Sequence, residues 1–458
     1  MWCTRHDPQG WLRHVHPVRP PGELRVSLVT PATHRSPPQR GVPDEGWRVQ
    51  RLLLAPHRLG FALAVLLLCT SALWWAMVLL DRATGALALP LAVSPSLGHA
   101  AVMTWGFLPL FFAGFLFTAG PKWLGVAAPQ TRSLVAPLVL QAAGWLVWLA
   151  GIHLNQSAAV AGAVVALLGL AWVVARFWAL VRASTLSDRV HARLVAWAGT
   201  LGVASLALMA GALAAGAIDL ARVAVLTALW GFVVTTFVAV AHRMIPFFTS
   251  SAVPMVHAWR PFWVLWVLLA AVALEVVAVW WQFVGWPAGA AGTVVRLALG
   301  TLEIAAGAVV IWLGVVWGLV QSLKVRLLAM LHLGFVWLGL AFLLAGATQW
   351  LSVWQGAPVL GLGALHALTM GCLGSLMLAM VTRVSCGHSG RTLVADDLVW
   401  ALFWSLQLAT VLRIAGAAQT APPALMWLAA LLWAAVMIVW GLRMAGWYGR
   451  PRSDGRPG

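Results

Sequence analysis

The sequence predicts an all-α polytopic membrane protein, a bundle of about twelve transmembrane helices with both termini in the cytoplasm. The first observation is composition: of 458 residues, 62% are apolar and only 9% are charged. A soluble domain usually carries about 25% charged residues, so a chain with this little polar surface needs lipid as its solvent. The second is a series of long apolar runs, and the third is the uneven placement of Lys and Arg.

A transmembrane helix needs about 20 consecutive, mostly apolar residues. Pro, Gly and clusters of charge separate the apolar runs, as expected where a helix leaves the bilayer. The twelve runs cover residues 59–80, 98–119, 133–151, 158–181, 194–217, 223–241, 262–284, 296–320, 327–350, 359–382, 398–418 and 423–446. We therefore expect a twelve-span domain over residues 52–447.

The chain ends have a different composition from the spans. Residues 1–51 are rich in Pro and Arg and lack the apolar region of a signal peptide. They offer too little apolar surface to offset the entropy lost on ordering. We expect a disordered basic tail over residues 1–51 and a disordered C-terminal tail over residues 448–458.

Orientation follows from the basic residues, which concentrate in cytoplasmic loops of membrane proteins. When alternate loops are pooled, one side of the predicted topology, which includes both termini, holds 25 of the 29 Lys and Arg residues. The other side holds four, namely Arg82, Arg222, Arg296 and Arg413. This asymmetry predicts that both termini lie in the cytoplasm.

Charge and cysteine usage exclude several classes of protein. The net charge of +17 arises from residues between apolar runs and does not form the basic patch of a nucleic-acid-binding protein. The four cysteines form no CxxC or CxxCH motif, which argues against a disulfide framework, a zinc cage and covalent haem. A haem or a copper ion bound through histidine remains possible on these grounds.

Two histidines are placed for metal chemistry. His99 and His366 begin the second and tenth predicted spans, both near the outer leaflet, and Met103 and Met370 follow each of them by four residues on the same helix face. Imidazole and thioether together suit Cu(I) or a haem iron. In the competing interpretation, the methionines fill space and the histidines bond to neighbouring helices.

The other histidines rank below this pair. His332 lies about two turns into the ninth span and is a third ligand candidate, and His153 ends the third span on the outer side. For those in the tail or in cytoplasmic segments we expect no chemical role; they are His6, His14, His16, His34, His57 and His191.

Two carboxyl groups are predicted inside the membrane. Glu275 lies near the middle of the seventh span and Glu303 in the outer half of the eighth. An acid at the centre of a helix costs about 2.5–3.5 kcal/mol on insertion scales, so it needs compensation. Each is a candidate for proton handling; the competing interpretation is a protonated Glu that hydrogen-bonds across the bundle.

Two segments on the cytoplasmic side combine glycine, proline and basic residues. After the tenth span, "TRVSCGHSGR" reads as a loop in which Arg383, His388 and Arg391 hold an anion or contact lipid phosphate. Arg243 begins a comparable segment, in which Pro246 is expected to end the sixth helix.

In the tenth span, small residues recur at every fourth position; these are Ala367, Gly371, Ser375 and Ala379. This spacing predicts close packing against a neighbouring helix.

Taken in order, four segments resemble the NnrS family over nearly the whole chain from about residue 52. They are "GHAAVMTWGFLPLFFAGFLFTAGPKWLG", "HRMIPFFT", "KVRLLAMLHLGFVWL" and "HALTMGCLGSLMLAMVTRVSCGHSGR". This family consists of bacterial inner-membrane proteins that contain haem and copper and are linked to nitric oxide metabolism, denitrification and resistance to nitrosative stress. The resemblance implies haem and copper as cofactors, and nitric oxide or a related small molecule as ligand.

One departure from the family pattern concerns the second span. The family motif reads H-x-H-E-M, whereas this chain has "HAAVM", with Ala101 and Val102 in place of the second His and the Glu. The histidines of the ninth and tenth spans are retained. The resemblance therefore supports haem more strongly than copper.

Other functions compete with this one. A proton-coupled permease for small solutes or metals is the main alternative, with Glu275 and Glu303 as coupling sites. A third possibility is the catalytic subunit of a haem-copper oxidase. The active site of such a subunit needs two adjacent histidines, and this sequence has no His-His pair, which argues against this class. The expected partners are membrane lipid, nitric oxide and an unspecified electron donor, without nucleic acid.

Overall fold

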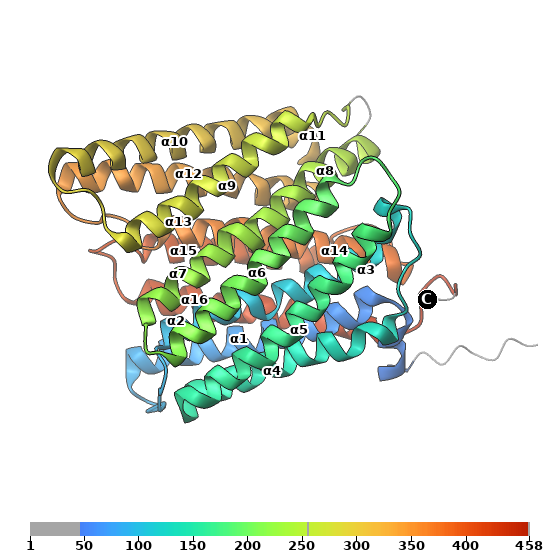
Figure 1. Ribbon diagram of the computed structural model, residues 1–458. Coiled ribbons are helices and arrows are strands. Elements are labelled where there is room, and N and C mark those ends of the chain that lie inside the picture. Colours follow the sequence, from blue (N-terminus) through green and yellow to red (C-terminus); the bar gives the residue numbers. More distant parts are fainter. Residues whose placement is uncertain (1–45, 254–255, 457–458) are drawn as a thin grey trace, which may run out of the picture. The chain divides into compact units, whose positions relative to one another are not determined.

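The structure is a computed structural model that describes residues 46–253 and 256–456. Within these residues it contains helices and no strand, and twelve helical spans are long and apolar enough to cross a membrane (Figure 1). The predicted fold class and number of spans are thus confirmed, and the chain is a multi-pass membrane protein. Most of the predicted basic tail, residues 1–45, lies outside the described residues.

Nine of the spans are single α-helices in the described part of the chain. Among these, only the span of α4, the third in the chain, is extended, by the short 3-10 helix η3 (Thr131–Leu134) that precedes it. The nine are α1 (Pro56–Thr84), α4 (Val135–Leu154), α5 (Gln156–Ala183), α6 (Val190–Ala214), α9 (Phe262–Val284), α10 (Gly289–Val316), α12 (Arg326–Gln355), α15 (Asp397–Ala415) and α16 (Ala424–Tyr448).

The second, sixth and tenth spans each contain a π-helical segment between two α-helices. These spans are α2 (Pro95–Ala101), η2 (Val102–Gly106) and α3 (Leu108–Leu124); α7 (Ile218–Ala228), η4 (Leu229–Val234) and α8 (Thr235–Ala252); and α13 (Gly363–His366), η5 (Ala367–Gly374) and α14 (Ser375–Ser389). π-helix is rare and occurs frequently at functional sites. Its presence in three spans marks them for closer inspection.

Two helix pairs pack through glycines that lie seven residues apart. In α4 and α5 these are Gly144 and Gly151 opposite Gly162 and Gly169, and α10 and α12 meet in the same way (Figure 1). A Cβ atom on Gly144 would lie 2.6 Å from the Gly162 carbonyl oxygen. The backbones therefore touch, which is how helices associate in lipid without a hydrophobic driving force.

The predicted ridge of small residues in the tenth span is also at a helix interface. Gly371 lies against the Trp337 indole of α12, since a Cβ there would be 2.6 Å from the ring. One turn later, the Ser375 side chain lies opposite Gly334 of the same helix. This interface brings η5 and α14 against α12.

Two expectations about helix ends are wrong. Helix α8 continues through Pro246 to Ala252, and α14 continues to Ser389, so "TRVSCGHSGR" is mostly helix and not a loop. Proline is tolerated in membrane helices because neighbouring groups satisfy the freed backbone atoms. The actual end of α14 is Gly390, whose φ of +73° is the left-handed conformation that favours glycine at a helix end.

The described ends of the chain meet on one side of the bundle. Trp47 Nε1 donates to the Ala445 carbonyl (3.0 Å), and the Arg48 amide donates to the Gly449 carbonyl (2.8 Å). The C-terminal segment, which we expected to be disordered, is described through Arg456, and its Ser453 amide donates to the Ser389 carbonyl. The two ends thus share a side, and the cytoplasmic identity of that side stays a prediction.

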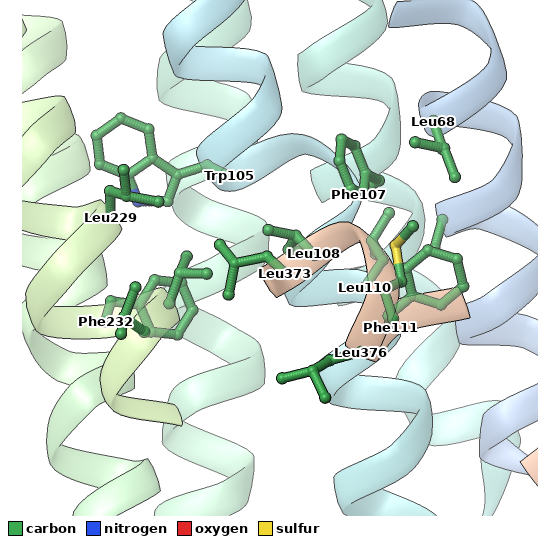
Figure 2. Packing of buried hydrophobic residues seen from close by; sticks show 14 of the residues in the cluster. Leu68, Trp105, Phe107, Leu108, Leu110, Phe111, Leu229, Phe232, Leu373 and Leu376 are labelled. Carbon is green, nitrogen blue, oxygen red and sulfur yellow. The ribbon is translucent and has the colours of Figure 1, made fainter. Parts of the chain in front are cut away.

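The core between the π-containing spans consists of large apolar side chains. Figure 2 shows Trp105 beside Leu229, and Leu108 beside Leu373, so the second span contacts both the sixth and the tenth. Trp105 is fully buried, and its Nε1 donates to the Gly202 carbonyl (3.1 Å). These contacts fix the three spans around a common interior.

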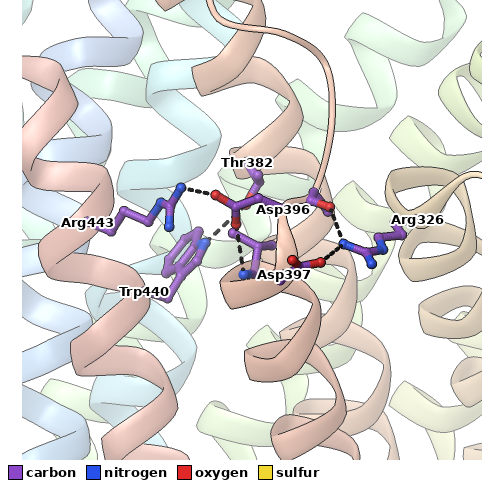
Figure 3. A network of polar contacts seen from close by, with 8 residues as sticks. Arg326, Thr382, Asp396, Asp397, Trp440 and Arg443 are labelled. Atoms are coloured by element: carbon purple, nitrogen blue, oxygen red, sulfur yellow. Dashed lines mark hydrogen bonds and ion pairs between the residues drawn. The ribbon is translucent and has the colours of Figure 1, made fainter.

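A polar network ties together the ends of three helices, α12, α15 and α16, on the side of the chain termini (Figure 3). Asp396 caps the start of α15 by accepting the Val399 amide (3.1 Å) and forms an ion pair with Arg443 of α16. Asp397 pairs with Arg326 of α12 at 2.6 Å. Because these groups are partly exposed, the network adds local stability rather than a buried charge site.

Asp396 allows a test of this network. We expect Asp396→Ala to lower the free energy of unfolding by about 1–2 kcal/mol, because it removes a helix cap and an ion pair. Asp396→Asn keeps a capping oxygen and should lose less. Thermal denaturation in detergent would measure both, and equal losses in the two variants would contradict the capping role.

Candidate functional site

A cavity of about 280 Å³ lies inside the bundle, toward the end opposite the chain termini. All three π-containing spans contribute to its wall, together with α1, α15 and α16. Its polar and sulfur-containing lining residues are Arg82, Ser96, His99, Met103, Thr104, His366, Thr369, Met370, Met377, Arg413 and Met426. The rest of the wall is apolar, as expected for a site that binds a largely apolar ligand.

His99 is held in this wall by an aromatic ring. Its imidazole stacks on the Trp75 indole of α1, with ring centroids 4.0 Å apart and an angle of 15° between the planes. Its Nδ1 is buried and has no hydrogen-bond partner within the described chain. Met103, one turn later, lines the same cavity. Packing against Trp75 therefore fixes the orientation of the His99 ring, and its Nδ1 is available to a ligand.

His366 has its orientation fixed by a hydrogen bond. Its Nδ1 lies 2.9 Å from the Leu362 carbonyl oxygen. Because a carbonyl only accepts, Nδ1 carries the proton and Nε2 keeps its lone pair. A hydrogen bond of this kind, which selects the tautomer and orients the ring, is typical of metal-binding histidines. Met370 follows on the same span and also lines the cavity.

The fold therefore brings together the four ligand candidates of the second and tenth spans. His99, Met103, His366 and Met370 border one space, and the positive charge of Arg413 lies within electrostatic reach of both histidines. π-helical turns follow both histidines directly or within one turn. This juxtaposition depends on tertiary packing and is not visible in either span alone.

These residues fit a haem. The cavity offers imidazole and thioether donors, which are the axial ligands that many proteins use for haem iron. It also has an apolar wall and two arginines, Arg82 and Arg413. For copper, the available donors are the same two imidazoles and thioethers, because the described residues contain no group of three or more His, Cys, Asp or Glu placed to hold a metal. Ala101 and Val102 are fully buried outside the lining of the cavity.

The third ligand candidate, His332, lies elsewhere. It is fully buried in α12 outside the lining of the cavity, and its Nε2 is 2.9 Å from Thr249 Oγ1 of α8. His153 accepts from Trp74 Nε1 (2.8 Å), and its Nδ1 contacts the Pro90 carbonyl (2.7 Å). Both histidines therefore join helices or loops by hydrogen bonds, and the structure does not bring them to His99 and His366.

The four residues predicted to hold an anion each have an aromatic partner. Arg243 lies over Trp123 (5.1 Å), Arg383 over Phe248 (4.1 Å) and Arg391 over Trp447 (4.5 Å). The fourth, His388, packs against His57, with ring centroids 4.4 Å apart. Each of the four groups thus contacts a different aromatic ring, and these contacts do not gather the groups around one ligand.

Glu275 and Glu303 are brought together from α9 and α10. Both are buried, with 7% and 2% of their surface exposed, and the two carboxyl groups are close enough to interact with each other. One oxygen of each carboxyl group remains buried without a partner among the described residues.

Two histidines for which we expected no role are buried in pairs. His57 packs against His388, and His191 Nε2 lies 3.0 Å from His242 Nδ1. The sequence places all four near helix ends on the cytoplasmic side, a setting in which histidine is usually exposed. The pairing arises from contacts between distant segments, and sequence periodicity carries no signal for it.

The chain matches a known protein family. The family model described as NnrS protein matches residues 51–452, from the first described helix to the C-terminal segment. Among curated proteins, none matches the chain. The matched region includes all twelve spans and every residue that lines the cavity.

Proposed function

The chain belongs to the NnrS family, and we propose from that premise that it binds haem in the cavity between its second and tenth spans. The proposed role is in nitric oxide metabolism or resistance to nitrosative stress at the bacterial inner membrane. The observation that supports it is the convergence of His99, Met103, His366 and Met370 on one interior space.

In this proposal the residues of the cavity have distinct tasks. His366 presents Nε2 because Nδ1 is committed to the Leu362 carbonyl, and His99 presents a ring fixed against Trp75. The apolar wall excludes water and admits a small uncharged molecule. When bound, the haem iron supplies the coordination site for nitric oxide.

The test is spectroscopic. We expect the full chain, purified after haem-replete expression, to show a Soret band that shifts when nitric oxide is added. Haem would be quantified per protein, and copper would be measured on the same sample. A preparation that is folded by size-exclusion chromatography and contains no haem would contradict the proposal.

Copper is the second cofactor of the proposal. The donors for it in this cavity are imidazole and thioether, which suit Cu(I). If haem and copper both bind in this space, they compete for His99 and His366. The copper content of the purified protein should then rise when haem is withheld during expression. Copper content independent of haem supply would place copper elsewhere.

The buried acid pair supports a second candidate function, a proton-coupled permease. A pair of buried carboxyl groups inside the membrane is a suitable coupling site. If the protein is such a permease, Glu303→Gln should abolish proton-driven uptake into proteoliposomes, because an amide does not release a proton. Gln349→Ala serves as the control, because it changes a polar residue of α12, which packs against α10, and leaves both carboxyl groups in place. Absence of gradient-dependent flux in the wild type would end this alternative.

A further inference from the structure

Two of the four basic residues on the predicted outer side line the cavity. They are Arg82, near the end of α1, and Arg413, near the end of α15. No Asp or Glu lines the cavity in the described part of the chain. Two guanidinium groups therefore border this space without a carboxylate in its lining to balance them.

The contacts of the two arginines leave their charge uncompensated. Arg82 lies over the Trp75 ring at 5.8 Å, the same ring on which His99 stacks. Its neighbour Asp81 is engaged elsewhere, because its carboxylate accepts the amides of Leu87, Ala88 and Leu89. Arg413 Nη1 is buried without a hydrogen-bond partner among the described residues.

The other two outer arginines are different. Arg222 pairs with Asp219 at 3.0 Å, and Arg296 lies over the Trp286 ring at 5.0 Å. Neither lines the cavity. The positive-inside rule disfavours basic residues on this side, and the feature that distinguishes Arg82 and Arg413 from the other two is their position in the cavity wall.

Arg82 is exposed and Arg413 is partly buried. A guanidinium that lacks a protein counter-charge is stabilised by an anion, and its planar donors match carboxylate geometry. We propose that Arg82 and Arg413 bind the carboxylate groups of the cavity's ligand, so that the site selects an apolar, planar body that carries acidic substituents. This inference rests on the proposed function, in which the ligand is haem and the carboxylates are its propionates. Arg82 and Arg413 are then specificity-determining residues.

The experiment compares haem with haem dimethyl ester, in which both carboxylates are blocked. The full chain, expressed under haem limitation and purified, would be titrated with each compound and followed by its Soret band. We expect the wild type to prefer haem by about a hundredfold, because each arginine donates a charge-assisted hydrogen bond to a carboxylate and one such bond changes affinity by about tenfold. Arg82→Ala and Arg413→Ala should each reduce this preference by about tenfold.

Arg222→Ala and Arg296→Ala are matched controls, since they remove an outer arginine without touching the cavity. Both should keep the wild-type preference. Arg82→Lys and Arg413→Lys, which keep the charge, should restore part of it and show that the alanine variants had not simply misfolded.

The outcomes separate this inference from the function on which it rests. If haem and its ester bind the wild type equally well, haem binding stands and the arginine role is overturned. If neither compound binds to folded protein, the proposed function fails. If the four alanine variants all lose the preference for haem over its ester to the same extent, the preference arises from the general positive charge of this side and not from recognition at the cavity.

Discussion

His366→Ala is expected to lower the haem content of the purified protein by at least tenfold. Even loss of a group that only supports a metal ligand typically reduces metal affinity 10- to 100-fold, and His366 is the histidine whose free nitrogen is fixed by a hydrogen bond. His99→Ala should have a comparable effect. The haem-to-protein ratio and the position of the Soret band would measure both.

His332→Ala is the matched control, because this histidine is buried outside the cavity and bonds to Thr249. It should lower thermal stability and leave the Soret band of the folded fraction unchanged. The reverse result, with haem lost in His332→Ala and retained in His99→Ala and His366→Ala, would move the haem site to the interface of α8 and α12.

The second large effect concerns the glycine contacts between α4 and α5. Gly162→Ala is expected to prevent recovery of folded protein or lower the melting temperature strongly. The added Cβ would lie 2.7 Å from the Gly144 carbonyl oxygen, and backbone atoms on the partner helix have no rotamer through which to move away. Overpacking typically costs about 1–3 kcal/mol even where side chains adjust.

Gly211→Ala in α6 is the control, because a Cβ there meets nothing within 4 Å. It should leave stability unchanged or raise it slightly, since alanine is favoured over glycine in a helix by about 1 kcal/mol. Thermal unfolding monitored by size-exclusion chromatography would compare the two. Equal behaviour of both variants would show that close backbone contact at Gly162 is unimportant.

The spans were predictable because hydropathy is a property of short windows of sequence. The seventh span, predicted over residues 262–284, has those bounds in the structure, and the other spans differ from prediction mainly by extra turns at their ends. Those turns include polar and basic residues, such as His388 in α14, that a hydropathy window excludes. Helix length beyond the lipid is set by capping and packing.

The candidate site was predictable only in parts. His99 and His366 stand out because imidazole is rare inside membranes, yet their meeting depends on how the second and tenth spans pack. His332, an equally rare residue, instead joins two helices. Arg82 and Arg413 appeared in the sequence only as exceptions to the charge bias, and they meet at the cavity because α1 and α15 both contribute to its wall.

The π-helical turns also escaped prediction, because they differ from α-helix by a single residue of register. A one-residue deletion inside η2 or η5 would restore regular winding and rotate everything before it by about 100° around the helix axis. His99 and His366 both precede these turns, so either deletion would swing an imidazole out of alignment while the span stayed just as hydrophobic. The orientation of His99 and His366 thus depends on the exact number of residues in these two turns, whereas the hydrophobicity that drives membrane insertion does not.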